Sequence, residues 1–295
     1  MKTNNLNVKK AVVPVAGFGT RFLPFTKAVP KEMLPIVDIP TIQLIVEELV
    51  ESGIEEILFI TNRNKHEIED HFDYTIELEH SLQKNGKEKE YEAIRKIADQ
   101  ANFYYKRQKE TKGLGHAILQ AKEFVGNDAF AVVLGDDIVY NPKQPAIGQL
   151  IEKFNKVEKS VVGCKKVPIR EIDKYGAIEA DKLDDRTYKI KWCVEKPKPE
   201  EAPSDVAILG RYVFTKDIFK YIEETKPGKG GEIQITDAID LLAKNEGVLG
   251  YIYNGKRYDI GSKIGFLEAT VEYALRDNEL KDEFREYLKG ICKEL

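Results

Sequence analysis

The stretch "AVVPVAGFGTRFLPFTKAVPKEMLPI" (residues 11–36) decides how the chain is expected to fold. It begins as an apolar run typical of a buried strand and then breaks at Gly17 and Gly19, which allow a tight backbone turn. Arg21 and Lys31 follow within the same stretch. Main-chain N–H groups in such a turn can point at an anion, and nearby cations add to the attraction. The stretch therefore predicts a phosphate-binding loop.

The spacing of this loop matches neither of the two common phosphate motifs. Phe22 stands where the dinucleotide fingerprint requires its third glycine, and the P-loop pattern does not occur. Arg21 offers a planar fork to phosphate oxygens and Lys31 a point charge. A strand and turn with solvated cations is the alternative interpretation, so these residues alone leave the ligand open.

The composition limits the possible partners of the protein. The chain has 295 residues and a formal net charge of −4, which argues against a general nucleic-acid or membrane-binding surface and requires any cationic site to be local. The three cysteines are odd in number and far apart, which favours a reducing, cytoplasmic location. No apolar run reaches the roughly 18 residues of a membrane helix. The N-terminal stretch before residue 11 is too short for a secretory signal.

Short β-rich runs alternate with helical patterns through the first part of the chain. This alternation predicts an α/β fold with a mostly parallel central sheet flanked by helices, whose ligand crevice lies at the carboxyl ends of the strands. We expect strands at residues 11–16, 56–61, 101–107, 130–135 and 160–167, and helices at residues 41–53, 115–126 and 146–157.

The rest of the chain departs from this pattern in three places. Residues 72–100 are expected to form a long, charged, helical insert, and the "KEKEYEAIRK" run within it suits a solvated helix face. After residue 167 the segments "YGAIEA", "KIKWCVEK" and "VAILGRYVF" predict strands of an extended or mixed sheet. Residues 262–295 show an amphipathic helical pattern.

The glycine loop and the segments after it resemble the signature of the nucleotidyltransferases that make sugar nucleotides. The resemblance is greatest to members that use UTP and glucose 1-phosphate, and Val15 in "PVAG" departs from their usual "PAAG". It continues, in the same order, through "RQKETKGLGHA" (107–117), "LGDDIV" (134–139), "KYGAIE" (174–179), "VEKP" (194–197), "ILGRYVF" (208–214), "GGEIQITDAI" (230–239) and "GKRYDIGSKIGF" (255–266).

The resemblance implies the organisation and the activity of the chain. It implies a Rossmann-like nucleotidyltransferase fold in a single domain, residues 1–295. Residues 8–167 would form the nucleotide-binding half with the 72–100 insert, residues 168–261 a mixed-sheet, sugar-binding half, and residues 262–295 the C-terminal helices. The implied reaction transfers UMP from UTP to glucose 1-phosphate, with Mg²⁺, and gives UDP-glucose and pyrophosphate. Members commonly self-associate, so a homo-oligomer, dimer or tetramer, is expected.

The resemblance also assigns the nucleotide site. Arg21 is expected to stabilise the β- and γ-phosphates and Lys31 the reacting phosphates. A side-chain amide can donate and accept at once, as the edge of uracil demands, and the family places Gln108 there with Gly113 close by. The remaining residues expected around the nucleotide belong to the loop: Ala16, Gly17, Gly19 and Thr20.

Two aspartates are the predicted Mg²⁺ ligands. Asp136 follows the apolar run of residues 130–135, and Asp259 lies between apolar residues and a glycine. Carboxylates at such positions suit a hard cation that takes oxygen ligands. An ordinary Gly-Asp turn explains Asp136 equally well from the residues alone, and the family implies both aspartates as ligands. Asp137 is expected to face elsewhere, because successive strand residues alternate sides.

The sugar site is also assigned by resemblance. Glu195 would accept hydrogen bonds from glucose hydroxyls, and Lys196 would bind the 1-phosphate. As neighbours in a strand, these two side chains are expected to point apart. Thr236 could simply be a helix cap. His116, at the start of a helix, fits a structural role as well as it fits a functional one. The family also brings Gly176, Gly210, Glu232 and Thr236 to the sugar.

Other functions remain open at this point. A thymidylyltransferase or another sugar-1-phosphate nucleotidyltransferase would share the fold, and NTP preference would discriminate them. A glycosyltransferase that consumes UDP-glucose could use "GDD" as metal carboxylates, although it has no need of a triphosphate loop. A catalytically idle sugar-nucleotide sensor is a third alternative, against which the intact Arg21, Lys31, Asp136 and Lys196 argue.

Overall fold

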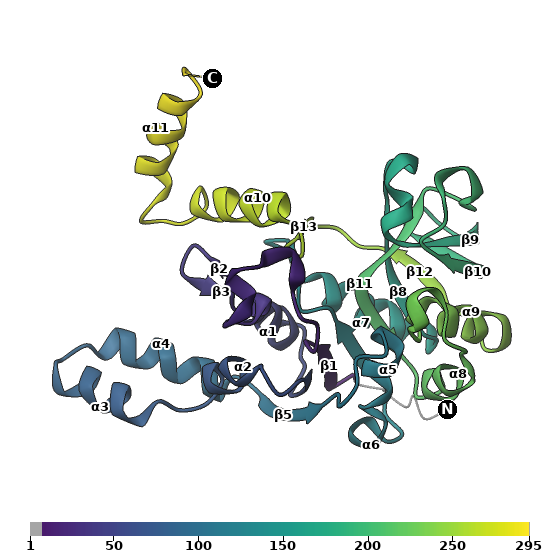
Figure 1. The fold of residues 1–295 in the computed structure, drawn as a ribbon, viewed down its shortest axis with the longest axis horizontal. Helices are drawn as coiled ribbons and strands as arrows, with labels where there is room; N and C mark the ends of the chain where they lie inside the picture. The colour runs from purple at the N-terminus through teal and green to yellow at the C-terminus, as the bar shows by residue number, and fades with distance from the viewer. Residues whose placement is uncertain (1–7, 295) are drawn as a thin grey trace.

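A nine-stranded sheet with helices on both faces runs through the chain (Figure 1), and the computed structural model describes residues 8–294. The strand order is β5-β4-β1-β6-β11-β8-β12-β10-β9. The first four strands are mutually parallel, whereas β11 runs antiparallel to both of its neighbours, β6 and β8. The predicted α/β class is therefore confirmed, with a parallel part followed by a mixed part.

The first part of the chain supplies the parallel strands and the helices that connect them. Its strands are β1 (Lys10–Pro14), β2 (Pro35–Ile36), β3 (Ile39–Pro40), β4 (Glu56–Thr61), β5 (Asn102–Arg107), β6 (Phe130–Val133), β7 (Asp137–Tyr140) and β8 (Val161–Lys166). Its α-helices are α1 (Thr41–Glu51), α2 (His66–His71), α3 (Ile76–Lys84), α4 (Glu88–Asp99), α5 (Leu114–Leu119), α6 (Lys122–Val125) and α7 (Ala146–Val157). Short 3₁₀ turns follow β1 at Thr20–Phe22, Phe25–Lys27 and Lys31–Met33.

The second part completes the sheet and ends in two helices. Its strands are β9 (Gly176–Lys182), β10 (Thr187–Glu195), β11 (Val206–Phe214), β12 (Leu249–Ile252) and β13 (Lys256–Asp259), of which β13 pairs with β7 outside the main sheet. Its α-helices are α8 (Ile218–Glu224), α9 (Ile235–Asn245), α10 (Lys263–Ala274) and α11 (Lys281–Ile291), and 3₁₀ turns lie at Ile169–Lys174, Pro199–Glu201 and Lys229–Gly231.

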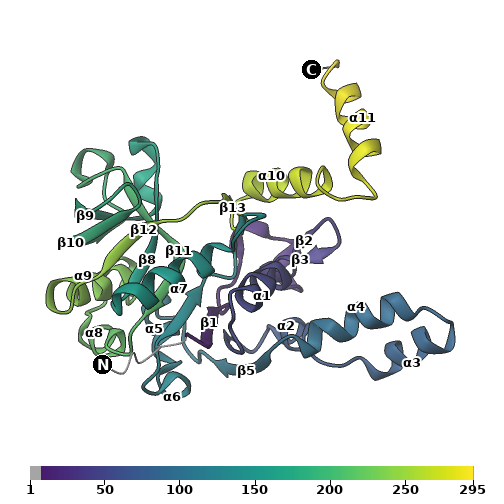
Figure 2. The same cartoon turned by 180° about the vertical axis from the view of Figure 1, so that it is seen from behind.

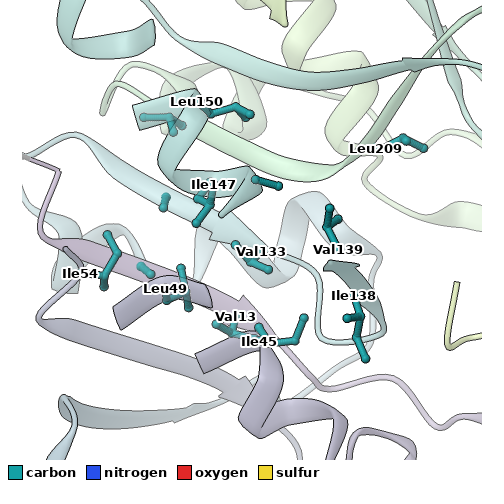
Figure 3. Close-up of a cluster of buried hydrophobic side chains, with 14 of the residues drawn as sticks. Val13, Ile45, Leu49, Ile54, Val133, Ile138, Val139, Ile147, Leu150 and Leu209 are labelled. Atoms are coloured by element: carbon teal, nitrogen blue, oxygen red, sulfur yellow. The ribbon is translucent and has the colours of Figure 1, made fainter. Parts of the chain in front are cut away.

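Alternation along the strands divides the core between the two faces of the sheet. Val13 of β1 packs with α1 and α7 on one face, whereas Val12 packs with α5, α8 and α9 on the other. Because both faces are covered, the central strands are apolar on both sides, as parallel strands must be. Figure 3 shows part of the first cluster, where Ile45 and Leu49 of α1 lie against Val13.

Two segments project from the same end of the molecule (Figures 1 and 2). One is the helical hairpin α3–α4, and the other is the arm formed by α10 and α11, with the C-terminus at its tip. No residue of α11 is buried. Helix α11, at the outer end of the arm, is therefore not packed into the core of the body.

Several predicted boundaries are wrong in detail. The helix expected at residues 115–126 is divided into α5 and α6, because bonds between residues three apart tighten the chain at Gln120 and Ala121. The insert expected at residues 72–100 contains two helices, which begin only at Ile76 and are separated at Gly86, where φ is 71°. The predicted single-domain range begins at residue 1, but residues 1–7 and 295 lie outside the described part of the chain.

Two further observations concern the expected surroundings of the protein. Within residues 8–294, no helix is long and apolar enough to cross a membrane. Cys164, Cys193 and Cys292 are all free thiols, and the first two are buried.

Candidate active site

A cavity of about 830 Å³ opens where the carboxyl end of β6 meets the mixed part of the sheet. Residues from both halves of the chain and from the start of the C-terminal segment line it. Of the predicted site residues, the lining includes Arg21, Asp136, Gly176, Glu195, Lys196, Gly210, Glu232, Thr236 and Asp259, but not Ala16, Gly17, Gly19, Thr20, Lys31, Gln108 or Gly113. The structure therefore gathers the predicted sugar and metal residues, with the glycine loop and the base residues outside this lining.

The glycine loop is closed on itself by the segment that follows it. Gly19 has φ of 66°, a conformation that favours glycine, and its carbonyl accepts a hydrogen bond of 2.8 Å from the Thr26 hydroxyl. A Cβ atom at Gly19 would lie only 3.0 Å from Cβ of Lys31. Lys31 thus passes directly beside the loop. The Arg21 guanidinium leaves the loop toward the cavity and donates to the carbonyl of Gly261 at 3.2 Å.

Lys31 and Asp136 form an ion pair beside the loop. The Lys31 ammonium donates to Oδ2 of Asp136 at 2.5 Å. Burial by itself would raise the pKa of Asp136, but the Lys31 charge and hydrogen bond outweigh it, so the pKa lies below its ordinary value. Burial would likewise lower the pKa of Lys31, and Asp136 reverses that effect and raises it. Both groups are therefore charged at neutral pH.

The two predicted metal ligands come together around Gly261. A Cβ atom at Gly261 would lie 3.0 Å from Oδ2 of Asp136, 3.1 Å from Oδ1 of Asp259 and 3.4 Å from Nη1 of Arg21. The amide of Ile260 donates to the Asp136 carbonyl at 3.0 Å, which holds the two segments together. Burial raises the pKa of Asp259, an effect that Arg257 opposes and the neighbouring carboxylates reinforce.

This donor set fits Mg²⁺ that shares its coordination with a nucleotide. Mg²⁺ commonly takes one or two carboxylates and completes its octahedron with water and substrate phosphates. Asp136 and Asp259 supply two carboxylates that face one point. The described residues contain no cluster of three or more His, Cys, Asp or Glu side chains able to enclose a metal.

The expectation that Glu195 and Lys196 point apart is wrong. Strand β10 ends at Glu195, and Lys196 has φ of 47°, so the backbone turns and the strand alternation no longer applies. The Lys196 ammonium returns to within 3.1 Å of Oε1 of Glu195. A left-handed conformation costs a non-glycine residue about 1–2 kcal/mol. The Lys196 amide, which donates to the Tyr175 carbonyl at 2.9 Å, helps to hold it there.

Thr236 holds Glu195 and is not a helix cap. Gln234 occupies the N-cap position of α9, and no side chain caps that end. The Thr236 hydroxyl instead donates to Oε2 of Glu195 at 2.6 Å. A Cβ atom at Gly176 would lie 2.9 Å from this hydroxyl and 3.4 Å from Oε2 of Glu195, so glycine leaves room for the contact. The Glu195 carboxylate is thus oriented from two sides, by Lys196 and by Thr236.

The other two sugar-site predictions differ in their surroundings. Gly210 lies against Asp137, whose Oδ2 would be 2.9 Å from a Cβ atom at that position. Its small size therefore accommodates Asp137 at the cavity wall. Glu232 is exposed at the cavity rim, and the side-chain amide of Gln234 donates to its carboxylate at 3.3 Å.

The predicted base residues form a separate cluster with His116. Gln108 is buried, and its side-chain nitrogen lies 2.8 Å from Nδ1 of His116 and 3.4 Å from the carbonyl of Gly113. Main-chain hydrogen bonds also join residues 112–115 to the predicted sugar-binding half. The Ile233 amide donates to the Lys112 carbonyl at 2.8 Å, and the Gly115 amide donates to the Ile233 carbonyl at 2.9 Å.

Sequence reasoning missed the buried charges that support the cavity. Asp137 is paired with Arg257 at 2.9 Å and lines the same cavity as Asp136 and Asp259, so the expectation that it faces elsewhere is wrong. Arg211, fully buried on β11, binds Glu48 of α1 through two nitrogens, at 3.0 and 2.7 Å. A charge inside an otherwise apolar run signals a buried partner. Glu48 and Arg211 both carried that signal.

Comparison with protein families matches residues 10–276 to the nucleotidyl transferase family. Over 284 residues the chain is 51% identical to the UTP–glucose-1-phosphate uridylyltransferase of Bacillus subtilis (strain 168), covering 96% of this chain and 97% of that protein.

Solved structures give the same family of neighbours. The fold matches that of UDP-glucose pyrophosphorylase complexed with UDP-glucose, with a TM-score of 0.84 and 45% identity, over 92% of this chain and 100% of that one. It also matches UTP-bound UGPase from Acinetobacter baumannii, with a TM-score of 0.89 and 38% identity, over 95% of this chain and 98% of that one.

Proposed function

The chain belongs to the nucleotidyl transferase family, and we propose that it transfers UMP from UTP to glucose 1-phosphate, giving UDP-glucose and pyrophosphate. The observation that carries the proposal is the convergence of Arg21, Asp136 and Asp259 on Gly261. One cation and two carboxylates meet there beside a cavity whose lining also includes Glu195 and Lys196. This arrangement suits a triphosphate and a sugar phosphate that meet end to end.

In the proposed reaction, a phosphate oxygen of glucose 1-phosphate attacks the α-phosphorus of UTP. A P–O bond forms there, and the bond from the α-phosphorus to the bridging oxygen breaks, so pyrophosphate leaves with the electron pair. The second pKa of a phosphate monoester is about 6, so the nucleophile is mostly ionised and needs no general base at neutral pH. Alignment and charge neutralisation are then the tasks of the site.

The cations on the loop side would neutralise the triphosphate. Arg21 would contact the β- and γ-phosphates, and Lys31 would exchange its Asp136 contact for the reacting phosphates. Asp136 and Asp259 would hold Mg²⁺, which supplies positive charge to the nucleotide oxygens when bound. The support for this assignment is the pairing of Lys31 with Asp136 and the shared approach of both carboxylates to Gly261.

The cavity wall around the end of β10 would bind the sugar phosphate. Lys196, turned back by its left-handed backbone, would orient the 1-phosphate, and Glu195 would accept hydrogen bonds from glucose hydroxyls. Because Thr236 already donates to one Glu195 oxygen, the carboxylate is held in place before the sugar arrives. Gly176, Gly210 and Glu232 complete this wall, and Gln108 with Gly113 would contact the uracil.

Pyrophosphate release is the test that separates the remaining alternatives. A coupled assay across four NTPs and several sugar 1-phosphates should give turnover with UTP and glucose 1-phosphate. Preference for dTTP would indicate a thymidylyltransferase instead. A glycosyltransferase would release no pyrophosphate but would consume UDP-glucose with an acceptor, and a sensor would bind without turnover.

Self-association and a cytoplasmic location are also part of the proposal. The arm α10–α11 projects from the body, and Ile264, Leu267 and Tyr287 on it are 65%, 55% and 63% exposed. A dimer or tetramer built on this arm would cover these apolar side chains. Sedimentation of the wild type beside Tyr287→Glu should show a smaller species for the variant. The free cysteines fit a reducing cytoplasm.

A further inference from the structure

We propose that His116 is a positioning residue that fixes the Gln108 amide with its carbonyl oxygen toward the nucleotide, and so sets the preference for uracil over cytosine. The inference rests on the proposed function, since it assumes that Gln108 contacts the base. It adds a residue outside the cavity lining and a physical reason for the choice of pyrimidine.

The orientation of the Gln108 amide follows from the groups that face its nitrogen. The Gly113 carbonyl, 3.4 Å away, can only accept a hydrogen bond. The atom of Gln108 that faces this carbonyl must therefore be the NH₂ group. The same nitrogen lies 2.8 Å from Nδ1 of His116, so Nδ1 must act as the acceptor of the second hydrogen. In a neutral imidazole the proton then resides on Nε2.

One contact on the other side of the ring competes with this tautomer, and it is the weaker of the two. The amide nitrogen of Gln120 lies 3.3 Å from Nε2 of His116 and donates to the His116 main-chain carbonyl at 3.2 Å. A neutral ring has one acceptor nitrogen, so Gln108 and Gln120 cannot both donate to it. The Gln108 contact is the shorter by 0.5 Å (3.3 against 2.8 Å), and Gln120 already has the carbonyl as its acceptor.

The ring is held in its neutral form, which keeps Nδ1 an acceptor. Burial lowers the pKa of His116, the Lys112 charge lowers it further, and Glu110 opposes these effects only in part. A protonated ring would present a hydrogen on Nδ1 and would repel the Gln108 NH₂ group. The amide would then rotate so that its oxygen faced the histidine.

The carbonyl oxygen of Gln108 is left available to a ligand. Both hydrogen bonds of the side chain use its nitrogen, and among the described residues Oε1 has no partner. That oxygen is not among the polar atoms sealed in the interior, although the residue as a whole is only 6% exposed. The free acceptor is therefore not completely sealed in the interior.

The chemistry of the pyrimidines turns this orientation into a preference. Uracil and thymine carry a hydrogen on N3, which the Gln108 oxygen can accept. Cytosine has a lone pair at N3, so an oxygen held in front of it would meet a second acceptor. A buried polar group left without its partner typically lowers affinity by 10-fold or more, and a rotated amide would remove that penalty for cytosine.

The experiment compares kcat/KM for UTP and CTP, with glucose 1-phosphate, in two His116 variants. His116→Leu removes the acceptor and should lower the UTP:CTP ratio on the order of 10-fold, through KM for UTP more than kcat. His116→Asp keeps an acceptor-only group at the reach of Nδ1 and should preserve the ratio. An unchanged ratio in His116→Leu, or an equal fall in both variants, would overturn the proposal.

Two controls separate this inference from the proposed function. Gln108→Leu should also lower the ratio, and if it does not, the assignment of Gln108 to the base fails. If Gln108→Leu lowers the ratio while His116→Leu leaves it unchanged, only the role of His116 fails. His80→Leu makes the same substitution at an exposed position of α3 and should leave kcat/KM unchanged for both nucleotides. Melting curves on every variant identify any loss of folding.

Discussion

The Lys31 ammonium lies 2.5 Å from a carboxylate oxygen of Asp136, although the two residues are 105 positions apart in the chain. A cation assigned to phosphate and a carboxylate assigned to Mg²⁺ therefore satisfy each other directly. A magnesium nucleotide offers both groups a replacement at once, because phosphate oxygens suit the lysine and the metal suits the aspartate. The pair can then separate without leaving a partly buried charge uncompensated.

Asp136→Asn should fold and lose most activity, because a neutral amide is a poorer Mg²⁺ ligand than a carboxylate. It also removes the charge that Lys31 faces. Initial rates over a range of Mg²⁺ concentrations measure the effect, and Asp259→Asn should behave similarly but less severely. Turnover near that of the wild type at ordinary Mg²⁺ would rule out the metal assignment of Asp136.

Arg21→Ala and Lys31→Ala should lower kcat more than they raise KM. Their charge is expected to matter most as negative charge shifts toward pyrophosphate, and each should cost roughly 10²–10³-fold, as for other preorganised electrostatic donors. Steady-state kinetics with both substrates provide the measurement. Lys84→Ala, at the exposed end of α3, is the matched control. An effect confined to KM would contradict a catalytic role for either residue.

Glu195→Ala should weaken the use of glucose 1-phosphate and leave UTP binding nearly intact. Loss of a hydrogen bond to a charged group should cost on the order of 10–100-fold, and the gap between glucose and galactose 1-phosphates should narrow. Thr236→Val, which removes the hydroxyl that orients Glu195, should act in the same direction but less strongly.

The ratio of kcat/KM for the two sugars decides this prediction. Thr270→Val removes a threonine hydroxyl that bonds only within α10, to the Phe266 carbonyl, and should leave the ratio unaltered. If Glu195 merely anchors the end of β10, its variant would lose thermal stability and both sugars would suffer alike. An unchanged ratio would remove Glu195 from the sugar site.

Arg211→Met should destabilise the protein by about 3–5 kcal/mol, because it leaves Glu48 buried without a partner. Glu48→Gln should also destabilise the protein, because it leaves the buried Arg211 charge without a carboxylate partner. Chemical denaturation monitored by the single Trp192 reports the change. Glu152→Gln, in the exposed pair with Lys156, should leave the midpoint nearly unchanged. Equally small changes in the free energy of unfolding for Arg211→Met and Glu152→Gln would contradict a large contribution from the buried ion pair.

The preference for UTP over CTP should hold at neutral pH and weaken when the pH falls below the ordinary histidine value of 6.5. The pKa of His116 is lowered, chiefly by burial, so the ring is neutral above that value and protonates only below it. Protonation converts Nδ1 from an acceptor to a donor. The UTP:CTP ratio measured from neutral to acid pH should show this step in the wild type and lack it in His116→Asp.

Local patterns predicted the elements well where periodicity and burial agree. The limits of β4, α7 and β11 are those expected, because each is a short apolar or amphipathic run bounded by polar residues. The expected helix at 115–126 failed because its break at Gln120 comes from tightened backbone bonding, which no breaker residue marks. The α/β class followed from the alternation of such runs.

The candidate site was predictable as a set of residues but not as a set of contacts. Asp136 and Arg21 belong to motifs that stand out locally, yet nothing local shows that Lys31 lies on Asp136. The turn of Lys196 escaped prediction because only glycine or asparagine usually signals a positive φ. The role of Thr236 escaped it because a threonine at the start of a helix is usually a cap.

The main-chain bonds between Ile233 and the Lys112–Gly115 segment have a consequence for how nucleotide and sugar preferences can evolve. A Cβ atom at Gly113 or Gly115 would lie 2.8 Å from the Ile233 carbonyl, so neither glycine can be replaced unless the opposite loop moves. A variant selected to use a new nucleotide should therefore also acquire compensating substitutions around residue 233, in the half proposed to bind the sugar. The nucleotide preference and the sugar preference of the protein should therefore change together during evolution.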